Sequence, residues 1–371
     1  MANNLPHDRR KFLSHTGTLA ASLGASLTVG SGALTWSSPV SAAAPSKPRI
    51  KVGQIGVRHA HATKLSAYRA SPDYEVIGIV ESDVKAREQA QSQAAFRDLP
   101  WMTEEQLLNL EGLDVVLVET AVRDSLAAAE RCLRANKHIH LDKPAGESFV
   151  DFRRIIELAR SQKLLIQMGY MFRYNPAIVL LREFLQRGWL GEVFEVHTVI
   201  SKVVDPASRK ELAEYPGGMM FELGCHVIDL VINIIGQPRT ITPYKQHVST
   251  LDDRLWDNML AVFETDHCIA TVKSSAVEVE GGNRRHLVVC GSEGTFHIQP
   301  LDRPAATLVL NSKRGEYRAG SQSLTFPKFT RYEADAADMA KVVRGEKETD
   351  FSLNHDLLVQ RSILLASGLS I

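Results

Sequence analysis

Cysteine is scarce in this chain, and its few copies form no pattern. Only four of the 371 residues are cysteine (Cys132, Cys225, Cys268 and Cys290), and no two of them stand in a C-x-x-C spacing. This distribution excludes a disulfide scaffold or a zinc ribbon as the organising principle of the fold, while one disulfide stays open.

An excess of charge of either sign is also absent. Lys+Arg and Asp+Glu number 43 each, and hydrophobic residues make up 44% of the chain. Without a basic excess we expect no nucleic-acid partner, and without a long unbroken apolar run we expect no membrane span. Length and composition instead indicate a globular enzyme of two packed domains.

The N-terminus resembles a Tat export signal. Arg9 and Arg10 form a twin-arginine pair, a weakly apolar stretch covers residues 16–36, and small residues suited to cleavage occupy positions 40–45. We therefore expect residues 1–44 to be a signal peptide and the mature protein to work in the periplasm or elsewhere outside the cytoplasm. A redox enzyme there would have to hold its nicotinamide cofactor tightly.

In the rest of the chain, the pattern of hydrophobic residues changes once. From 48 to 167, short apolar strands alternate with amphipathic helices, which predicts a Rossmann-like doubly wound α/β domain. From 168 to 371, longer alternating strands predict an α+β domain with a mainly antiparallel sheet. The strands are expected at 50–55, 75–80, 114–118, 138–141, 164–167, 193–203, 260–264, 268–277, 285–290, 294–299 and 306–310.

The end of the first strand predicts a dinucleotide site. Gly53 and Gly56 would open a phosphate loop, and Glu81, which closes the second strand, would bind the adenosine ribose hydroxyls. A carboxylate there disfavours a 2′-phosphate, so NAD is expected rather than NADP. Arg58 and His61 stand where the pattern normally has glycine or alanine.

Two histidine pairs invite a metal interpretation. His59 and His61 could be ligands of the His-x-His kind that follows a first strand in some hydrolases. The sequence offers no further metal ligand at the expected positions. We therefore predict that His59 and His61 line the entrance of the cofactor or substrate site and that no metal is bound. His138 and His140, within a strand, are interpreted as packed or supporting residues.

Two further groups carry candidate chemistry. Asp142 and Lys143 follow an apolar strand and should lie at the carboxyl edge of the sheet, where Lys143 can exchange a proton with a substrate hydroxyl. Glu222 and His226 are four residues apart, so on a helix they share one face and suit acid–base work or hydroxyl orientation.

These residues resemble motifs of the Gfo/Idh/MocA oxidoreductases, from about residue 50 to the C-terminus. Asp142-Lys143-Pro144 is similar to the family's Glu-Lys-Pro motif, and Gly217-Gly218 with Glu222 to His226 is similar to its Gly-Gly, Asp-x-x-x-His segment. Residues 170–176 and 289–295 resemble the stretch that opens the family's second domain and its "GTEG" turn.

The resemblance implies hydride transfer between NAD and a sugar, cyclitol or related polyol, with Lys143 as catalytic lysine, assisted by His226 and Glu222. It also implies a homodimer or homotetramer. Pocket-lining roles fall to Tyr170 and Arg173. The cofactor site would be formed by Gly53, Gly56, Arg58, His59, His61, Glu81, Glu119, Thr120, Asp142 and Lys143.

Two alternatives stay open. A redox-assisted glycosidase or lyase would use bound NAD to oxidise a ring hydroxyl transiently and restore it after elimination. A non-catalytic sugar-binding protein would keep the Rossmann scaffold after its phosphate loop had decayed, and Arg58 is the residue that favours this alternative.

Overall fold

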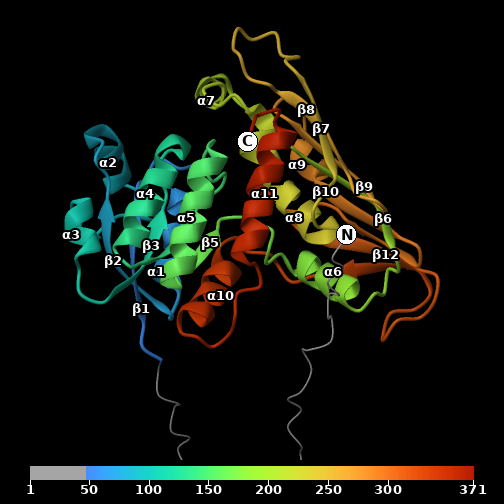
Figure 1. The fold of residues 1–371 in the computed structure, drawn as a ribbon, viewed down its shortest axis with the longest axis horizontal. Helices are drawn as coiled ribbons and strands as arrows, with labels where there is room; N and C mark the ends of the chain where they lie inside the picture. Colours follow the sequence, from blue (N-terminus) through green and yellow to red (C-terminus); the bar gives the residue numbers. More distant parts are fainter. Residues whose placement is uncertain (1–46) are drawn as a thin grey trace, which may run out of the picture. The chain divides into compact units, whose positions relative to one another are not determined.

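The computed structural model describes residues 47–371 (Figure 1). The export signal predicted at 1–44 lies outside these residues. Within the described part of the chain, no helix combines the length and the apolar character needed to cross a membrane.

The first part of the described chain forms a five-stranded parallel sheet with the strand order β2-β1-β3-β4-β5. Val, Ile and Leu dominate its strands because both faces are covered. Figure 1 shows α4 and α5 beside these strands. The strands are β1 (Ile50–Ile55), β2 (Tyr74–Val80), β3 (Leu113–Val118), β4 (His138–Leu141) and β5 (Ile166–Met168). The helices are α1 (Leu65–Ala70), α2 (Val84–Gln91), α3 (Glu104–Leu108), α4 (Val122–Arg134) and α5 (Phe149–Gln162), with a 3-10 turn, Ala62–Lys64, before α1.

One isolated bridge completes the topology of this sheet. Trp101 pairs in parallel with Ile79 of β2, on the side of β2 away from β1. Counted as a minimal strand, it converts the order to the 3-2-1-4-5-6 arrangement of dinucleotide-binding sheets. The chain then reverses direction across the sheet between β1 and β3, which is where such folds bind ligands.

The later part of the chain forms an eight-stranded sheet with the strand order β13-β12-β11-β10-β6-β9-β8-β7. All neighbours are antiparallel except β6 and β9. The predicted fold class is therefore confirmed. The strands are β6 (Val193–Ser201), β7 (Thr240–Gln246), β8 (Asn258–Glu264), β9 (Ile269–Ser275), β10 (His286–Gly291), β11 (Gly294–Ile298), β12 (Ala305–Leu310) and β13 (Gly320–Thr325).

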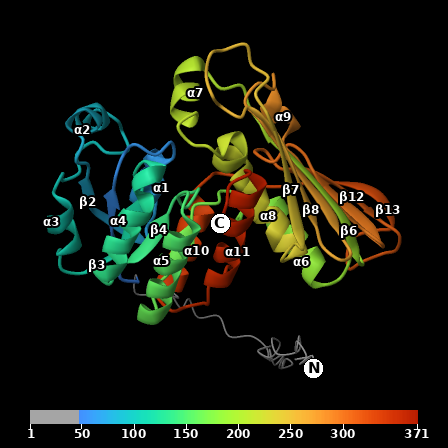
Figure 2. The ribbon, with the colours of Figure 1, turned by 45° about the horizontal axis from the view of Figure 1, so that its top comes forward.

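Helices of the second half lie on one face of this sheet and also return to the first sheet. Figures 1 and 2 show α6 and α8 along the sheet and α11 beside α8. Ala336 and Met339 of α10 share a hydrophobic core with Tyr74 of β2, whose hydroxyl donates to the Ala336 carbonyl at 2.7 Å. These helices are α6 (Pro176–Gln186), α7 (Pro206–Leu212), α8 (Cys225–Ile235), α9 (Gly281–Arg284), α10 (Glu333–Val343) and α11 (Leu353–Ala366).

The structure adds two strands that the sequence pattern did not predict. β7 and β13 are the two edge strands of the large sheet, and β7 contains Pro243. Edge strands tolerate proline and exposed polar residues because one side needs no hydrogen-bonded neighbour. The segment that carries Glu222 and His226 is helical, but it begins with a π-helical turn, Met220–Gly224, which runs into α8.

Two glycines at the end of β1 have different roles. Gly53 lies within the strand, where a Cβ would approach Leu107 Cδ1 of α3 to 2.6 Å, so it serves packing rather than cofactor contact. Gly56 follows the strand with φ of +92°, and a Cβ there would lie 2.6 Å from the Thr120 backbone nitrogen. The turn therefore requires glycine at position 56.

We predict that Gly56→Ala destabilises the fold by at least about 1–3 kcal/mol, because the left-handed backbone is strained and the new methyl meets backbone atoms that cannot move independently. Urea denaturation should measure the loss. Gly282→Ala is the matched control, since a Cβ at Gly282 meets nothing within 4 Å. Equal stability of the two variants would contradict this explanation of the turn.

Candidate functional site

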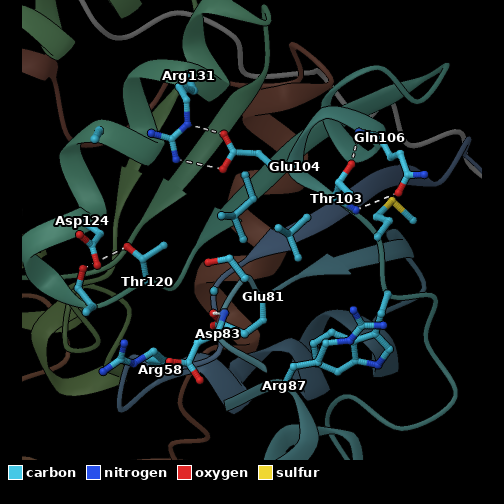
Figure 3. A pocket seen from close by; sticks show the side chains of 18 residues that line it. Arg58, Glu81, Asp83, Arg87, Thr103, Glu104, Gln106, Thr120, Asp124 and Arg131 are labelled. Carbon is cyan, nitrogen blue, oxygen red and sulfur yellow. Dashed lines mark hydrogen bonds and ion pairs between the residues drawn. The ribbon is translucent and has the colours of Figure 1, made fainter. Parts of the chain in front are cut away.

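A cavity of about 750 Å³ opens at the carboxyl ends of β1, β2 and β3. Gly56, Glu81 and Thr120, which follow these three strands in turn, all line it, and Arg58 lies at its wall. Figure 3 shows Arg58, Glu81 and Thr120 around the cavity, together with an ion pair between Arg131 and Glu104. The structure thus brings four of the predicted cofactor residues to the switch point of the sheet.

Glu81 is held in place by the backbone. Its Oε2 accepts a hydrogen bond from Val57 N at 3.1 Å, and its Oε1 accepts one from Asp83 N at 2.9 Å. The carboxylate therefore connects the loop after β1 with the loop after β2. Each carboxylate oxygen has a further lone pair, so the group can also accept from a ligand hydroxyl in the cavity.

Beside the cavity, a buried ion cluster surrounds the ammonium group of Lys64. Lys64 Nζ donates to Asp142 Oδ2 at 2.6 Å and to His140 Nε2 at 2.7 Å, and it forms an ion pair with Glu119 Oε1 at 3.1 Å. Although burial disfavours its charge, the two carboxylates raise the pKa of Lys64. Burial raises the pKa of Glu119, whereas against the same penalty His59 and Lys64 hold the pKa of Asp142 well below its usual range.

Both histidines of the His-x-His pair face this cluster. His59 Nδ1 lies 3.1 Å from Asp142 Oδ2 and 3.6 Å from Glu119 Oε2, while His59 Nε2 lies 3.0 Å from the Lys143 carbonyl oxygen. His61 Nδ1 lies 3.3 Å from Asp142 Oδ2. Burial lowers the pKa of His61 to about 4, so this ring is neutral at pH 7.

Lys143 projects from the cluster toward the second half of the chain. Its side chain is 2% exposed, and Nζ donates to the Glu222 carbonyl at 2.9 Å and lies 3.4 Å from Glu222 Oε1. Burial opposes both charges, but their attraction raises the pKa of Lys143, and Lys143 with Lys202 lowers the pKa of Glu222 to about 2. Lys143 is therefore an ammonium donor in the resting protein.

His226 lies in the same region and is neutral. Its ring centroid is 5.8 Å from that of His61, 6.0 Å from Phe172 and 6.5 Å from Tyr170. Burial and the nearby Lys143 charge lower its pKa well below 6.5. His226 Nδ1 and Glu222 Oε2 are buried without a hydrogen-bond partner, so the described residues leave two polar atoms available to a ligand.

Arg173 has a structural environment rather than the pocket-lining position that the sequence analysis assigned to it. It is 3% exposed, and its guanidinium donates to Asp229 and Asp356, each at 2.6 Å from Nη2. The guanidinium also stacks on Tyr170 at 4.8 Å and on Phe351 at 4.0 Å. Tyr170 thus lies between this ion network and His226.

Two members of the cluster were not identified as site residues from the sequence. Lys64 belongs to no recognisable sequence motif. Its partners Glu119, His140 and Asp142 lie at the ends of strands far along the chain, so their contact with Lys64 cannot be inferred from local spacing. The contact of His140 with Lys64 agrees with the interpretation of His140 as a supporting residue. The four cysteines, Cys132, Cys225, Cys268 and Cys290, are all free thiols, so the disulfide that the sequence left open does not form.

A parallel sheet with a cavity at its switch point, followed by a large, mainly antiparallel sheet, defines a Rossmann-type nucleotide-binding protein. Residues 50–170 match the family model described as "Oxidoreductase family, NAD-binding Rossmann fold", and residues 178–297 match the "GFO/IDH/MocA C-terminal domain". The chain belongs to the GFO/IDH/MocA family of oxidoreductases.

Similarity to individual proteins is more distant. Inositol 2-dehydrogenase of Salmonella typhimurium is 26% identical over 195 residues, which are 52% of this chain and 56% of that protein. A dTDP-3,4-didehydro-2,6-dideoxy-alpha-D-glucose 3-reductase of Streptomyces violaceoruber is 27% identical over 176 residues, 46% of this chain and 50% of that protein. The chain spans about half the length of the curated relatives it matches.

A solved structure supports the fold over a longer span. An NAD binding oxidoreductase from Klebsiella pneumoniae superposes with a TM-score of 0.74, covering 85% of this chain and 95% of that chain at 15% identity. At this identity the likeness concerns the fold alone.

Because Arg173 neutralises two buried carboxylates, we predict that Arg173→Met lowers the free energy of unfolding by about 3–5 kcal/mol. Arg123→Met is the control, since Arg123 pairs with Glu214 at the exposed surface and should contribute less than about 1 kcal/mol. Urea denaturation compares the two. A small loss for Arg173→Met would show that the buried network is not essential to the fold.

Proposed function

We propose that this chain is an NAD-dependent oxidoreductase acting on a CH–OH group of a sugar, cyclitol or related polyol. The observation that carries the proposal is the position of Lys143, a buried ammonium at the carboxyl end of β4. It lies beside Glu222 and His226, which have unpartnered polar atoms. The named activities of the inositol and sugar relatives favour this substrate class.

The residues around the cavity fit a dinucleotide. Gly56 keeps the backbone after β1 free of a side chain, and Arg58 offers a cation where a pyrophosphate would need one. Glu81 at the end of β2 suits two ribose hydroxyls and repels a 2′-phosphate, which supports NAD over NADP. We further propose that Asp142 acts through the ion cluster, as support for Lys143, and not by direct contact with the cofactor.

Bound NAD would supply the acceptor for a hydride from the carbinol carbon. The proton of the substrate hydroxyl needs a separate acceptor, and neutral His226, with a free Nδ1, suits that role better than protonated Lys143. Lys143 would donate a hydrogen bond to the reacting oxygen and stabilise its developing negative charge, and in the reverse direction protonated His226 would return the proton to that oxygen. Glu222 Oε2 would accept from a neighbouring substrate hydroxyl.

The setting of the enzyme is part of the proposal. The twin-arginine segment supports export by the Tat route to the periplasm, and a compartment without free nicotinamide nucleotide favours a tightly held cofactor that the substrate cycle regenerates. Exposed apolar side chains on the large sheet, among them Tyr244, Ile269 and Val309, favour a homodimer or homotetramer.

We predict that Lys143→Met lowers kcat by about 10²–10⁴-fold, because the variant loses the donor to the reacting oxygen. NAD reduction should be followed with a panel of sugars and cyclitols that includes inositol, and NAD binding should be measured on the same samples. Lys85→Met, a change at an exposed lysine of α2, is the control. Undiminished turnover by Lys143→Met, with folding and NAD binding intact, would refute the catalytic assignment.

A further inference from the structure

The hydrogen bonds of His59 define which ring nitrogen carries the proton and which carries a lone pair. Its Nε2 faces the Lys143 carbonyl at 3.0 Å, and a carbonyl oxygen can only accept, so Nε2 carries the proton. Its Nδ1 then has a lone pair, yet Nδ1 faces Asp142 Oδ2 at 3.1 Å and Glu119 Oε2 at 3.6 Å. Three atoms with lone pairs converge there, and this is an arrangement that a cation can bridge.

A proton on His59 Nδ1 is one candidate for that cation, but the backbone argues against it. The His61 backbone N–H points at His59 Nδ1 over 3.2 Å, and an N–H group needs a lone pair as its acceptor. An imidazolium would set two N–H groups against each other. A metal ion would take the Nδ1 lone pair in place of the contact with the His61 N–H at 3.2 Å, and it would leave the Nε2 hydrogen bond to the Lys143 carbonyl unchanged.

We propose that His59 Nδ1, His61 Nδ1 and Asp142 form a binding site for a divalent first-row transition metal. The three ligand atoms lie within 4.8 Å of one another, and both nitrogens are within 3.3 Å of Asp142 Oδ2. Two imidazoles and one carboxylate are the donor set that Fe²⁺ and Zn²⁺ accept, whereas Mg²⁺ and Ca²⁺ prefer oxygen ligands.

The surroundings of these ligands resemble the support that metal sites receive. A metal-bound histidine usually donates its second N–H to a carbonyl or carboxylate, as His59 does to Lys143. Asp142 is held by hydrogen bonds from Lys143 N at 2.7 Å and from Lys64 Nζ at 2.6 Å. The His61 side chain is 15% exposed, which gives an ion access from solvent. The sequence analysis predicted no metal because Asp142, the third ligand, lies 81 positions beyond His61.

The test uses the full mature chain without an affinity tag, treated with a chelator and then titrated with Co²⁺, whose absorption bands report coordination. We expect saturation at one Co²⁺ per chain and displacement by Zn²⁺. His61→Asn should weaken binding by at least about 100-fold, since even the loss of a supporting residue costs 10–100-fold. His267→Asn, which changes an exposed turn histidine, should bind as the unmodified chain does.

Two results would overturn the metal site. One is the absence of saturable Co²⁺ binding, which would leave His59 as a neutral ring whose Nδ1 accepts only from the His61 N–H. The other is binding that both His61→Asn and Asp142→Asn leave unchanged, which would place the ion elsewhere. NAD binding is measured in parallel, because the metal site does not rest on the proposed function. Loss of Co²⁺ binding with NAD binding intact refutes only the metal site, and the reverse refutes only the dinucleotide site.

Discussion

The buried ion pair between Lys64 and Asp142 is the interaction on which the rest of the site depends. Lys64 Nζ lies 2.6 Å from Asp142 Oδ2, and both side chains are almost fully excluded from solvent. An ion pair in such a place is strongly destabilised when one partner is removed. The ion pair thereby fixes Asp142 at the carboxyl end of β4. Because Lys143 is the next residue, its backbone position is fixed as well, and its side chain extends from there to Glu222.

The charge states of Lys143 and His226 complement each other. Against the effect of burial, Glu222 raises the pKa of Lys143 and keeps it protonated, whereas burial and the Lys143 charge together lower the pKa of His226 and keep it neutral. One group thus offers a proton and another can accept one, since His226 Nδ1 has no hydrogen-bond partner among the described residues. This division of roles arises because the two halves of the chain contribute different groups. Lys143 follows β4 of the first sheet, Glu222 lies in the π-helical turn before α8, and His226 lies in α8 itself.

Local signals made much of the fold predictable. The strands over 50–55 and 138–141 match β1 and β4 in both bounds, and Thr103 forms a capping box with Gln106 at the start of α3, as the Thr-x-x-Gln spacing indicates. The roles of Lys64 and Arg173 were not predictable in the same way, because their partners lie far along the chain. Asp142 is 78 positions from Lys64, and Asp229 and Asp356 are 56 and 183 positions from Arg173. Their environments depend on which strands and helices become neighbours.

The most direct test is to purify the protein without added nucleotide, denature it, and identify the released small molecules by mass spectrometry. The account predicts NAD or NADH in near-stoichiometric amount, held in the cavity between Gly56, Arg58 and Glu81. A protein that releases no nucleotide, and that also fails to bind added NAD or NADP, would contradict it. Arg58 would then be the sign of a phosphate loop that no longer binds a dinucleotide.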